Sequence, residues 1–152
     1  MRKPSDAIII ESRRAFDNVV LVARHRGRRT GGASFWLAQA ERVRMKYDHM
    51  REHEVVAEDG LVAVLRSIDI YWMCRRRGLG ARLVHLGSRL ARKSGAIALY
   101  VHSVNIDGTD PAPFYRSCGF TVIRSNSDSN HYMKKLLTRV GGGVPKSEEI
   151  SC

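Results

Sequence analysis

Three consecutive arginines stand directly before a pair of glycines near the middle of the chain, as Arg75-Arg76-Arg77-Gly78-Leu79-Gly80. Leucines then recur at helical spacing, at positions 79, 83, 86 and 90, so a helix is predicted to begin at the glycines. No Ser, Thr, Asp or Asn is present there to cap the helix, and its first amide groups therefore have no partner inside it. Free N–H donors, the positive end of a helix and cationic side chains together favour a phosphate-bearing ligand at this turn.

Several kinds of glycine-rich turn bind phosphate, and their patterns differ. The dinucleotide-binding pattern G-x-G-x-x-G requires a third glycine where this chain has Leu83. The loop of the NTPases requires a lysine and a Ser or Thr after its last glycine, and this turn has neither. The pattern R-x-x-G-x-G, by contrast, is satisfied by Arg75, Gly78 and Gly80.

The glycine turn lies inside a predicted βαβ unit. The apolar run Leu61–Trp72 precedes the turn, and a second strand-like run, Ala96–Val101, follows the helix. Arg92 and Lys93 in the last helical turn, with Gly95 beyond it, are typical of a helix end. A strand, a helix and a strand in this order predict parallel strands joined by the helix.

The first third of the chain predicts an antiparallel hairpin. Its strands are Asn18–Ala23 and Ala33–Ala38, and a basic turn, Arg24–Gly32, connects them. Ser5–Asp17 has mixed helical and strand character. Gln39–His53 is predicted to be a helix, with an irregular insertion as the alternative.

The last third predicts a short helix and a final pair of strands. The helix is Phe114–Cys118, which Gly119 ends, and the strands are Phe120–Ile123 and His131–Met133. We expect residues 1–139 to form a single domain and residues 140–152, which include three successive glycines, to be a flexible tail.

The composition is that of an ordinary globular protein with a high positive charge. The 152 residues are 43% hydrophobic and 27% charged, and the net charge is +11. This charge favours a polyanionic partner such as a nucleotide, a nucleic acid or an acidic protein surface. No apolar run has the length of a membrane span, so we expect no membrane partner. Cys74, Cys118 and Cys152 lack metal-ligand spacing, which predicts no metal and a reducing, cytoplasmic location.

Three motifs follow one another in a fixed order. They are the turn at residues 75–80, Asn105 after the next strand, and the run Phe114-Tyr115-Arg116-Ser117-Cys118-Gly119-Phe120. Together they resemble the GNAT superfamily of acetyl-CoA-dependent N-acetyltransferases, whose members share an aromatic-Tyr-x-x-x-Gly-Phe ending. The resemblance covers about residues 61–137. It implies an α+β fold of the three-layer α/β kind, with a mixed, splayed β-sheet flanked by helices and acetyl-CoA between two parting parallel strands.

The resemblance also implies which residues bind acetyl-CoA. The strand that enters the turn would offer main-chain groups to the pantetheine arm, and the turn would wrap the pyrophosphate with its amides. Asn105 would contact the cofactor, and Tyr115 would stand near its sulfur as general acid, because the departing thiolate needs a proton. The implied cofactor-binding residues are Ile68, Asp69, Ile70, Arg75, Arg76, Arg77, Gly78, Leu79, Gly80, Ala81, Asn105 and Tyr115.

The resemblance does not supply a general base. Family members often place a glutamate on one of the two central strands, whereas the equivalent positions here are Val64 and Tyr100. Asp69, His102 or a chain of water molecules could substitute, or the amine could arrive already neutral. Asp69 could instead pair with an arginine. The predicted catalytic residues are therefore Tyr115, Asp69 and His102.

The chain departs from the family at two further places. Ser5–Asp17 is too short to hold the first strand and the two helices that usually precede the hairpin, so we expect a shortened N-terminal part. The interval from Asn105 to Tyr115 is longer than is common and contains Pro111 and Pro113. The helix before Tyr115 should therefore be short or displaced.

The function that the resemblance implies is transfer of an acetyl group from acetyl-CoA to a primary amine. The acceptor could be a protein N-terminus, a lysine or a small molecule, and a homodimer stays open. The alternatives are an acetyl-CoA-binding protein that has lost catalysis and, with less support, a basic nucleic-acid-binding domain. The positive charge disfavours a polycationic acceptor unless acidic residues gather near it, and the candidates are Glu52, Glu54, Glu58 and Asp59.

Overall fold

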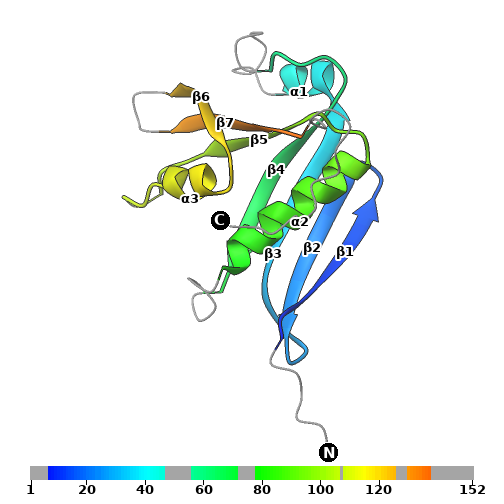
Figure 1. Ribbon diagram of the computed structural model, residues 1–152, viewed down its shortest axis with the longest axis vertical. Helices are drawn as coiled ribbons and strands as arrows, with labels where there is room; N and C mark the ends of the chain where they lie inside the picture. Colours follow the sequence, from blue (N-terminus) through cyan, green and yellow to red (C-terminus); the bar gives the residue numbers. More distant parts are fainter. Residues whose placement is uncertain (1–6, 47–55, 72–77, 107, 126–129, 138–152) are drawn as a thin grey trace, which may run out of the picture.

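A mixed β-sheet with helices on both faces forms the fold, as the computed structural model shows for residues 7–46, 56–71, 78–106, 108–125 and 130–137 (Figure 1). The sheet has seven strands in the order β1-β2-β3-β4-β5-β7-β6, and only β4 and β5 pair in parallel. The predicted α+β architecture is therefore confirmed. The elements are β1 (Ile9–Ala15), β2 (Asn18–His25), β3 (Arg28–Gln39), α1 (Ala40–Lys46), β4 (Leu61–Ile70), α2 (Leu79–Lys93), β5 (Ala98–Ser103), α3 (Ala112–Ser117), β6 (Thr121–Ser125) and β7 (His131–Leu136).

The front of the chain, predicted to have mixed helical and strand character, holds a strand. β1 pairs with β2 along its whole length, from Ile9 opposite Arg24 to Ala15 opposite Asn18. The segment thus holds one strand, and it does not hold a strand and two helices together, as expected from its length. Only the turn Phe16-Asp17 separates the two strands, so no helix stands between them.

The second hairpin is longer than predicted. β2 and β3 continue pairing until His25 faces Arg28, which leaves only Arg26 and Gly27 as the turn. Both turn residues have positive φ angles, 51° and 78°, as the tight turns that suit the right-handed strand twist require. The glycine pays no steric penalty for this conformation. The basic stretch predicted to be a loop is therefore mostly strand.

The predicted βαβ unit is confirmed, with β5 beginning at Ala98. β4 carries a bulge at Arg66, because Leu65 faces Phe35 and Ser67 already faces Ser34. The parallel ladder with β5 covers only Ala63–Leu65 of β4. Beyond the bulge the two strands part, as Figure 1 shows for β4 and the strands β5 and β7. A bulge bends a strand and increases its twist, which is a local reason for this splay.

Two apolar cores lie on the two faces of the sheet. Helices α2 and α3 cover the face that we call the α2 face, and α1 covers the other, which we call the α1 face. Large buried residues on the α2 face include Leu21, Phe35, Leu83, Leu99 and Met133. Those on the α1 face include Trp36, Val43, Val56, Val64 and Tyr100.

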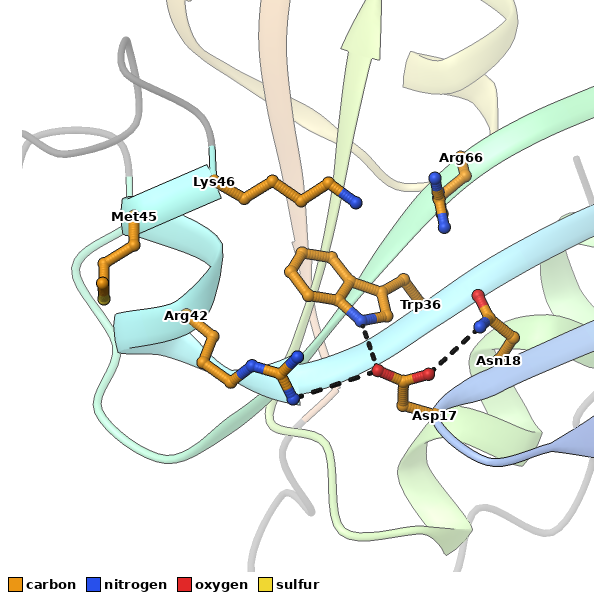
Figure 2. Close-up of a pocket in the computed structure, with 7 residues that line it drawn as sticks. All are labelled: Asp17, Asn18, Trp36, Arg42, Met45, Lys46 and Arg66. Carbon is orange, nitrogen blue, oxygen red and sulfur yellow. Dashed lines mark hydrogen bonds and ion pairs between the residues drawn. The ribbon is translucent and has the colours of Figure 1, made fainter.

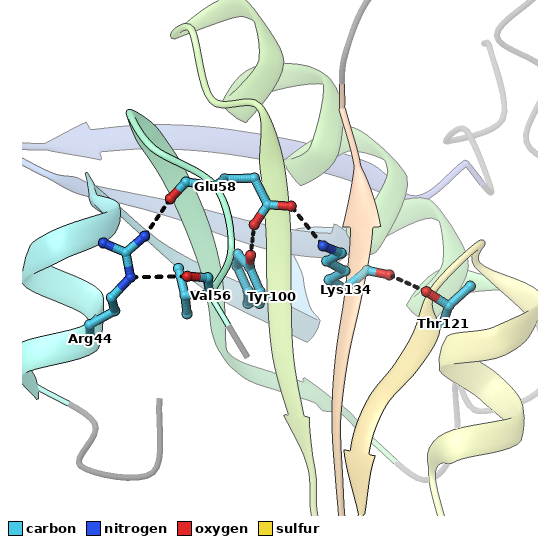
Figure 3. A network of polar contacts seen from close by, with 6 residues as sticks. All are labelled: Arg44, Val56, Glu58, Tyr100, Thr121 and Lys134. Atoms are coloured by element: carbon cyan, nitrogen blue, oxygen red, sulfur yellow. Dashed lines mark hydrogen bonds and ion pairs between the residues drawn. The ribbon is translucent and has the colours of Figure 1, made fainter. Parts of the chain in front are cut away.

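A polar network holds the segment before β4 against the α1 face (Figure 3). The Glu58 carboxylate accepts a hydrogen bond from the Tyr100 hydroxyl, and its other oxygen lies 2.7 Å from Lys134 Nζ. The Arg44 guanidinium donates to the carbonyl oxygens of Val56 and Glu58, at 2.9 and 2.7 Å. Since a partly buried carboxylate needs partners, this network fixes the segment to α1, β5 and β7.

Candidate active site at the parting of β4 and β5

The start of α2 has the properties of an anion site. Gly78 is its N-cap with φ 74°, no side chain caps the helix, and its first turn contains no acidic residue. The predicted uncapped helix start is thus confirmed. The N–H groups of the first turn are left for a ligand, and the helix dipole adds positive potential to them. Gly78 suits this point because a left-handed φ is costly for a residue with a side chain.

The two glycines of the turn, Gly78 and Gly80, have different structural roles. A Cβ added to Gly78 would meet none of the described residues within 4 Å, so they leave space open beside it. A Cβ on Gly80 would lie 2.9 Å from Ile70 Cδ1 and 3.1 Å from Phe114 Cζ. Gly80 therefore lets the helix start pack closely against β4 and α3, and Gly78 is the glycine that borders free space.

The residues predicted to meet the pantetheine arm alternate between the faces of β4. Ile68 and Ile70 pack against the core of the α2 face. Asp69 lies between them and so points to the α1 face, where it is exposed. Its carboxylate pairs with Arg29 Nη2 at 3.2 Å, which confirms the alternative of an arginine partner. The predicted cofactor residues Arg75, Arg76 and Arg77 lie outside the described residues.

Tyr115 lies on α3 at the α2 face, in an aromatic cluster. Its ring stands at 5.3 Å from the Phe114 ring and 5.7 Å from the Phe120 ring, centroid to centroid. The side chain is buried, and this burial raises the pKa of the phenol above 10.0, with a smaller contribution from Cys118. The phenol is therefore protonated at neutral pH, as an ordinary tyrosine also is, and the raised pKa makes it a weaker acid.

Two further groups mark the ends of the parting strands. Asn105 follows β5, and its main-chain N–H donates to Asn130 Oδ1 at 2.8 Å. Ser103, the last residue of β5, is 1% exposed, and its hydroxyl has no hydrogen-bond partner in the described part of the chain. A buried hydroxyl without a partner is costly, so Ser103 is an unsatisfied polar group at the end of β5. No pattern in the sequence indicated a role for Ser103.

The predicted catalytic residues do not meet at one point. Tyr115 belongs to the α2 face, whereas His102 stacks on the Tyr132 ring at 4.2 Å on the α1 face. Asp69 is also on the α1 face, beyond the bulge. Tyr100 is fully buried and binds the Glu58 carboxylate, so a carboxylate does reach this central position, although from a segment outside the central strands.

A second site that the sequence did not indicate lies on the α1 face. It is a hollow of about 420 Å³ lined by residues of β2, β3, α1 and β4 together with the first hairpin turn (Figure 2). The lining residues are Asp17, Asn18, Trp36, Arg42, Met45, Lys46 and Arg66. They lie far apart in the sequence and show no common motif, so only the pairing of the strands brings them together.

The seven-stranded mixed sheet with its flanking helices has the fold of the GNAT acetyltransferases. Among solved structures, nourseothricin acetyltransferase is similar, with a TM-score of 0.59 and 21% identity over 81% of this chain and 67% of that one. A Desulfovibrio desulfuricans protein assigned to the GNAT family is similar with a TM-score of 0.61 and 16% identity, over 80% of this chain and 70% of that one. PaiA N-acetyltransferase from Thermoplasma acidophilum, in complex with coenzyme A, is similar with a TM-score of 0.58 and 16% identity, over 79% of this chain and 61% of that one.

These likenesses establish the fold. No protein-family model and no curated protein sequence matches this chain. Among the described helices, none is long and apolar enough to cross a membrane.

Proposed function

We propose that this protein transfers an acetyl group from acetyl-CoA to a primary amine. The observation that carries the proposal is the uncapped start of α2, with open space beside Gly78, next to the point where β4 and β5 part. A diphosphate needs several N–H donors in a small concave site, and a helix N-terminus provides them. The likeness of the fold to proteins crystallised with coenzyme A supports this choice of ligand.

The residues at this place fit acetyl-CoA. The amides at the start of α2 would hold the phosphates, and Ile68 and Ile70 would provide an apolar wall for the pantetheine arm. The buried hydroxyl of Ser103 would donate to a polar group of the ligand, which would remove the cost of leaving it unpaired. Acetyl-CoA supplies an activated acyl group as its thioester.

Tyr115 has the properties of the general acid in this reaction. The amine nitrogen forms a bond to the thioester carbonyl carbon, the carbon–sulfur bond breaks, and the sulfur leaves with the electron pair. The Tyr115 hydroxyl gives its proton to this sulfur, and the new amide nitrogen loses one proton to water or to a base. The phenol carries its proton at neutral pH, and the thiolate that forms is the base that takes it.

Among the described residues, this site has no evident general base to take a proton from the acceptor amine. Val64 stands where family members often carry a glutamate, and the Glu58 carboxylate is already bound by Tyr100 and Lys134. An amine that arrives neutral needs only a water molecule to accept its proton. The same observation favours a second candidate function, a coenzyme A-binding protein without catalysis.

The experiment that tests the proposal compares Gly78→Asn with Gly78→Asp. The two side chains have nearly the same shape and both tolerate a left-handed φ, so only the charge differs. Calorimetry should show coenzyme A binding to Gly78→Asn and binding weaker by about tenfold or more to Gly78→Asp, since a carboxylate then faces the phosphates. Equal affinities of the two variants for coenzyme A would show that no phosphate binds beside Gly78 and would contradict the proposal.

A second measurement separates the two candidate functions. Release of the free thiol from acetyl-CoA is followed with a panel of primary amines. Amine-dependent thiol release supports the transferase. Binding of coenzyme A without release for any amine would favour the protein that has lost catalysis.

A further inference from the structure

The hollow on the α1 face lies beside the point where β4 leaves β5. Arg66, the bulge residue of β4, is one of its walls. Trp36 forms its base from β3, and Arg42 and Lys46 project over it from α1, as Figure 2 shows. An acyl group held between the parting strands from the α2 face would be reached by a nucleophile from this side.

The charges of the described residues around the hollow are unbalanced. Among these residues, Arg42, Lys46 and Arg66 face a single carboxylate, that of Asp17. That carboxylate already accepts hydrogen bonds from Trp36 Nε1 at 2.8 Å and from Asn18 Nδ2 at 3.1 Å, and Arg42 Nη1 lies 4.0 Å from it.

Lys46 contacts the Trp36 ring, and Arg66 acts on Asp17 through its charge without reaching ion-pair distance. The Lys46 ammonium lies 4.8 Å from the centroid of the Trp36 ring, a cation–π contact. Within the described residues, neither Lys46 nor Arg66 has an acidic side chain at ion-pair distance. Two cations on opposite sides of an aromatic base favour a ligand that carries negative charge.

The acidic residues that would suit a polycationic acceptor are engaged elsewhere. Glu58 binds Tyr100 and Lys134, and Asp59 is exposed and pairs with Arg44 at 3.5 Å. Glu52 and Glu54 lie outside the described residues. The hollow itself therefore repels a polyamine more than it attracts one.

We propose that this hollow binds the oxyanion of the acceptor, so that the acceptor is a small amine bearing a carboxylate or a phosphate. This inference rests on the proposed acetyl transfer. Arg66 and Lys46 hold the oxyanion, Trp36 supports the carbon chain, and the amine points toward the gap between β4 and β5. The carboxylate and the phosphate present the same chemistry to these cations, and matched probes distinguish them.

A binding experiment tests the hollow without catalysis. The sequence has two tryptophans, so Trp72→Phe leaves Trp36 as the one reporter of fluorescence. In this background we expect β-alanine or phosphoethanolamine to change the emission saturably, and ethanolamine, which lacks the oxyanion, to have no effect. Arg66→Gln and Lys46→Gln should each weaken this binding by about tenfold. Lys93→Gln, an exposed change on α2, is the matched control and should have no effect.

The same variants then test the role in catalysis. Arg66→Gln and Lys46→Gln should raise KM for the anionic amine several-fold and leave the affinity for coenzyme A unchanged. Preference for ethanolamine over both anionic amines, or an equal loss in Lys93→Gln, would overturn the inference. If the anionic probes bind at Trp36 but coenzyme A does not bind, the oxyanion site stands and the proposed transferase fails. If coenzyme A binds and no anionic probe does, the transferase stands and the oxyanion site fails.

Discussion

Tyr115 is a case in which packing sets the chemistry of one side chain. The phenol lies among Phe114, Phe120 and Cys118, and burial raises its pKa. The shift favours the neutral phenol, so the folded state binds this proton more tightly than the unfolded chain does. Its contribution to stability is therefore fully present below about pH 10 and is lost as the pH rises through the raised value.

We expect Tyr115→Phe to lower kcat by about 100-fold, because a positioned general acid contributes at least that much. The ring packing remains in the variant, so the affinity for coenzyme A and the thermal midpoint should change little. Steady-state kinetics, calorimetry and thermal unfolding provide the three readouts. Equal losses in kcat and in coenzyme A affinity would make Tyr115 a packing residue.

The pKa of Asp17, on the α1 face, is shifted in the opposite direction to that of Tyr115. The hydrogen bond from Trp36 Nε1 is the main cause that lowers the Asp17 pKa below 3.8, and Arg42 and Arg66 lower it further. The carboxylate form is favoured in the folded state. Its contribution to stability is thus present above the unfolded pKa and is lost as the pH falls through the lowered value.

Asp17→Asn should therefore lower the thermal midpoint at pH 7, although Asn can still accept the hydrogen bond from Trp36. The difference from the native chain should shrink as the pH falls below the ordinary carboxyl range, since both chains then carry a neutral group. Thermal unfolding across acid pH measures this. A difference that stays constant with pH would mean that the charge of Asp17 does not stabilise the fold.

At the scale of elements, the approach of α2 to the sheet depends on one glycine. A Cβ at Gly87 would lie 2.0 Å from Phe35 Cζ, so α2 packs directly against the flat ring of β3. Glycine is normally unfavourable inside a helix. At position 87 the close packing against Phe35 outweighs this loss in helix propensity. The distance between α2 and β3 positions the helix start beside the end of β4.

We expect Gly87→Ala to destabilise the protein by about 1–3 kcal/mol, because overpacking outweighs the gain in helix propensity. Phe35→Leu alone should also destabilise it by leaving a cavity. In the double variant, the smaller side chain makes room for the methyl group, so the two losses should not add. Urea unfolding of all four chains gives this coupling. Simple additivity would show that Gly87 and Phe35 do not constrain each other.

At the scale of the whole molecule, the net charge of +11 gives the protein an overall attraction for anions. Long-range attraction of this kind speeds the encounter with an anionic ligand and is screened by salt. The charge is thus consistent with a phosphate-bearing co-substrate and with an anionic acceptor. It also explains why a basic sequence alone suggested nucleic acid as an alternative.

The affinity for coenzyme A should fall by about threefold or more when the salt concentration rises from about 50 mM to about 500 mM. Pantetheine, the part of the coenzyme without phosphate, is the control ligand and should bind with little salt dependence. Calorimetry on both ligands measures the difference. The same affinity for coenzyme A at both concentrations would mean that its phosphates do not contact the protein's positive charge.

Local chemistry was enough to predict the centre of this protein. The glycines, the leucine spacing and the missing cap specified the start of α2, and the aromatic run specified the short helix α3 that carries Tyr115. These features depend on residues a few positions apart, which is the range over which propensity and periodicity act. β1 was missed because an edge strand of mixed composition is defined by its partner β2.

The tertiary structure alone decided the faces and the second site. Glu58 meets Tyr100 and Lys134 across 42 and 76 residues of sequence, and Trp36 meets Asp17 across 19. Asp69 and Tyr115 were predicted to act together, but strand alternation and the bulge put them on opposite faces. Strand pairing and register fix such contacts, and no local pattern in the sequence encodes them.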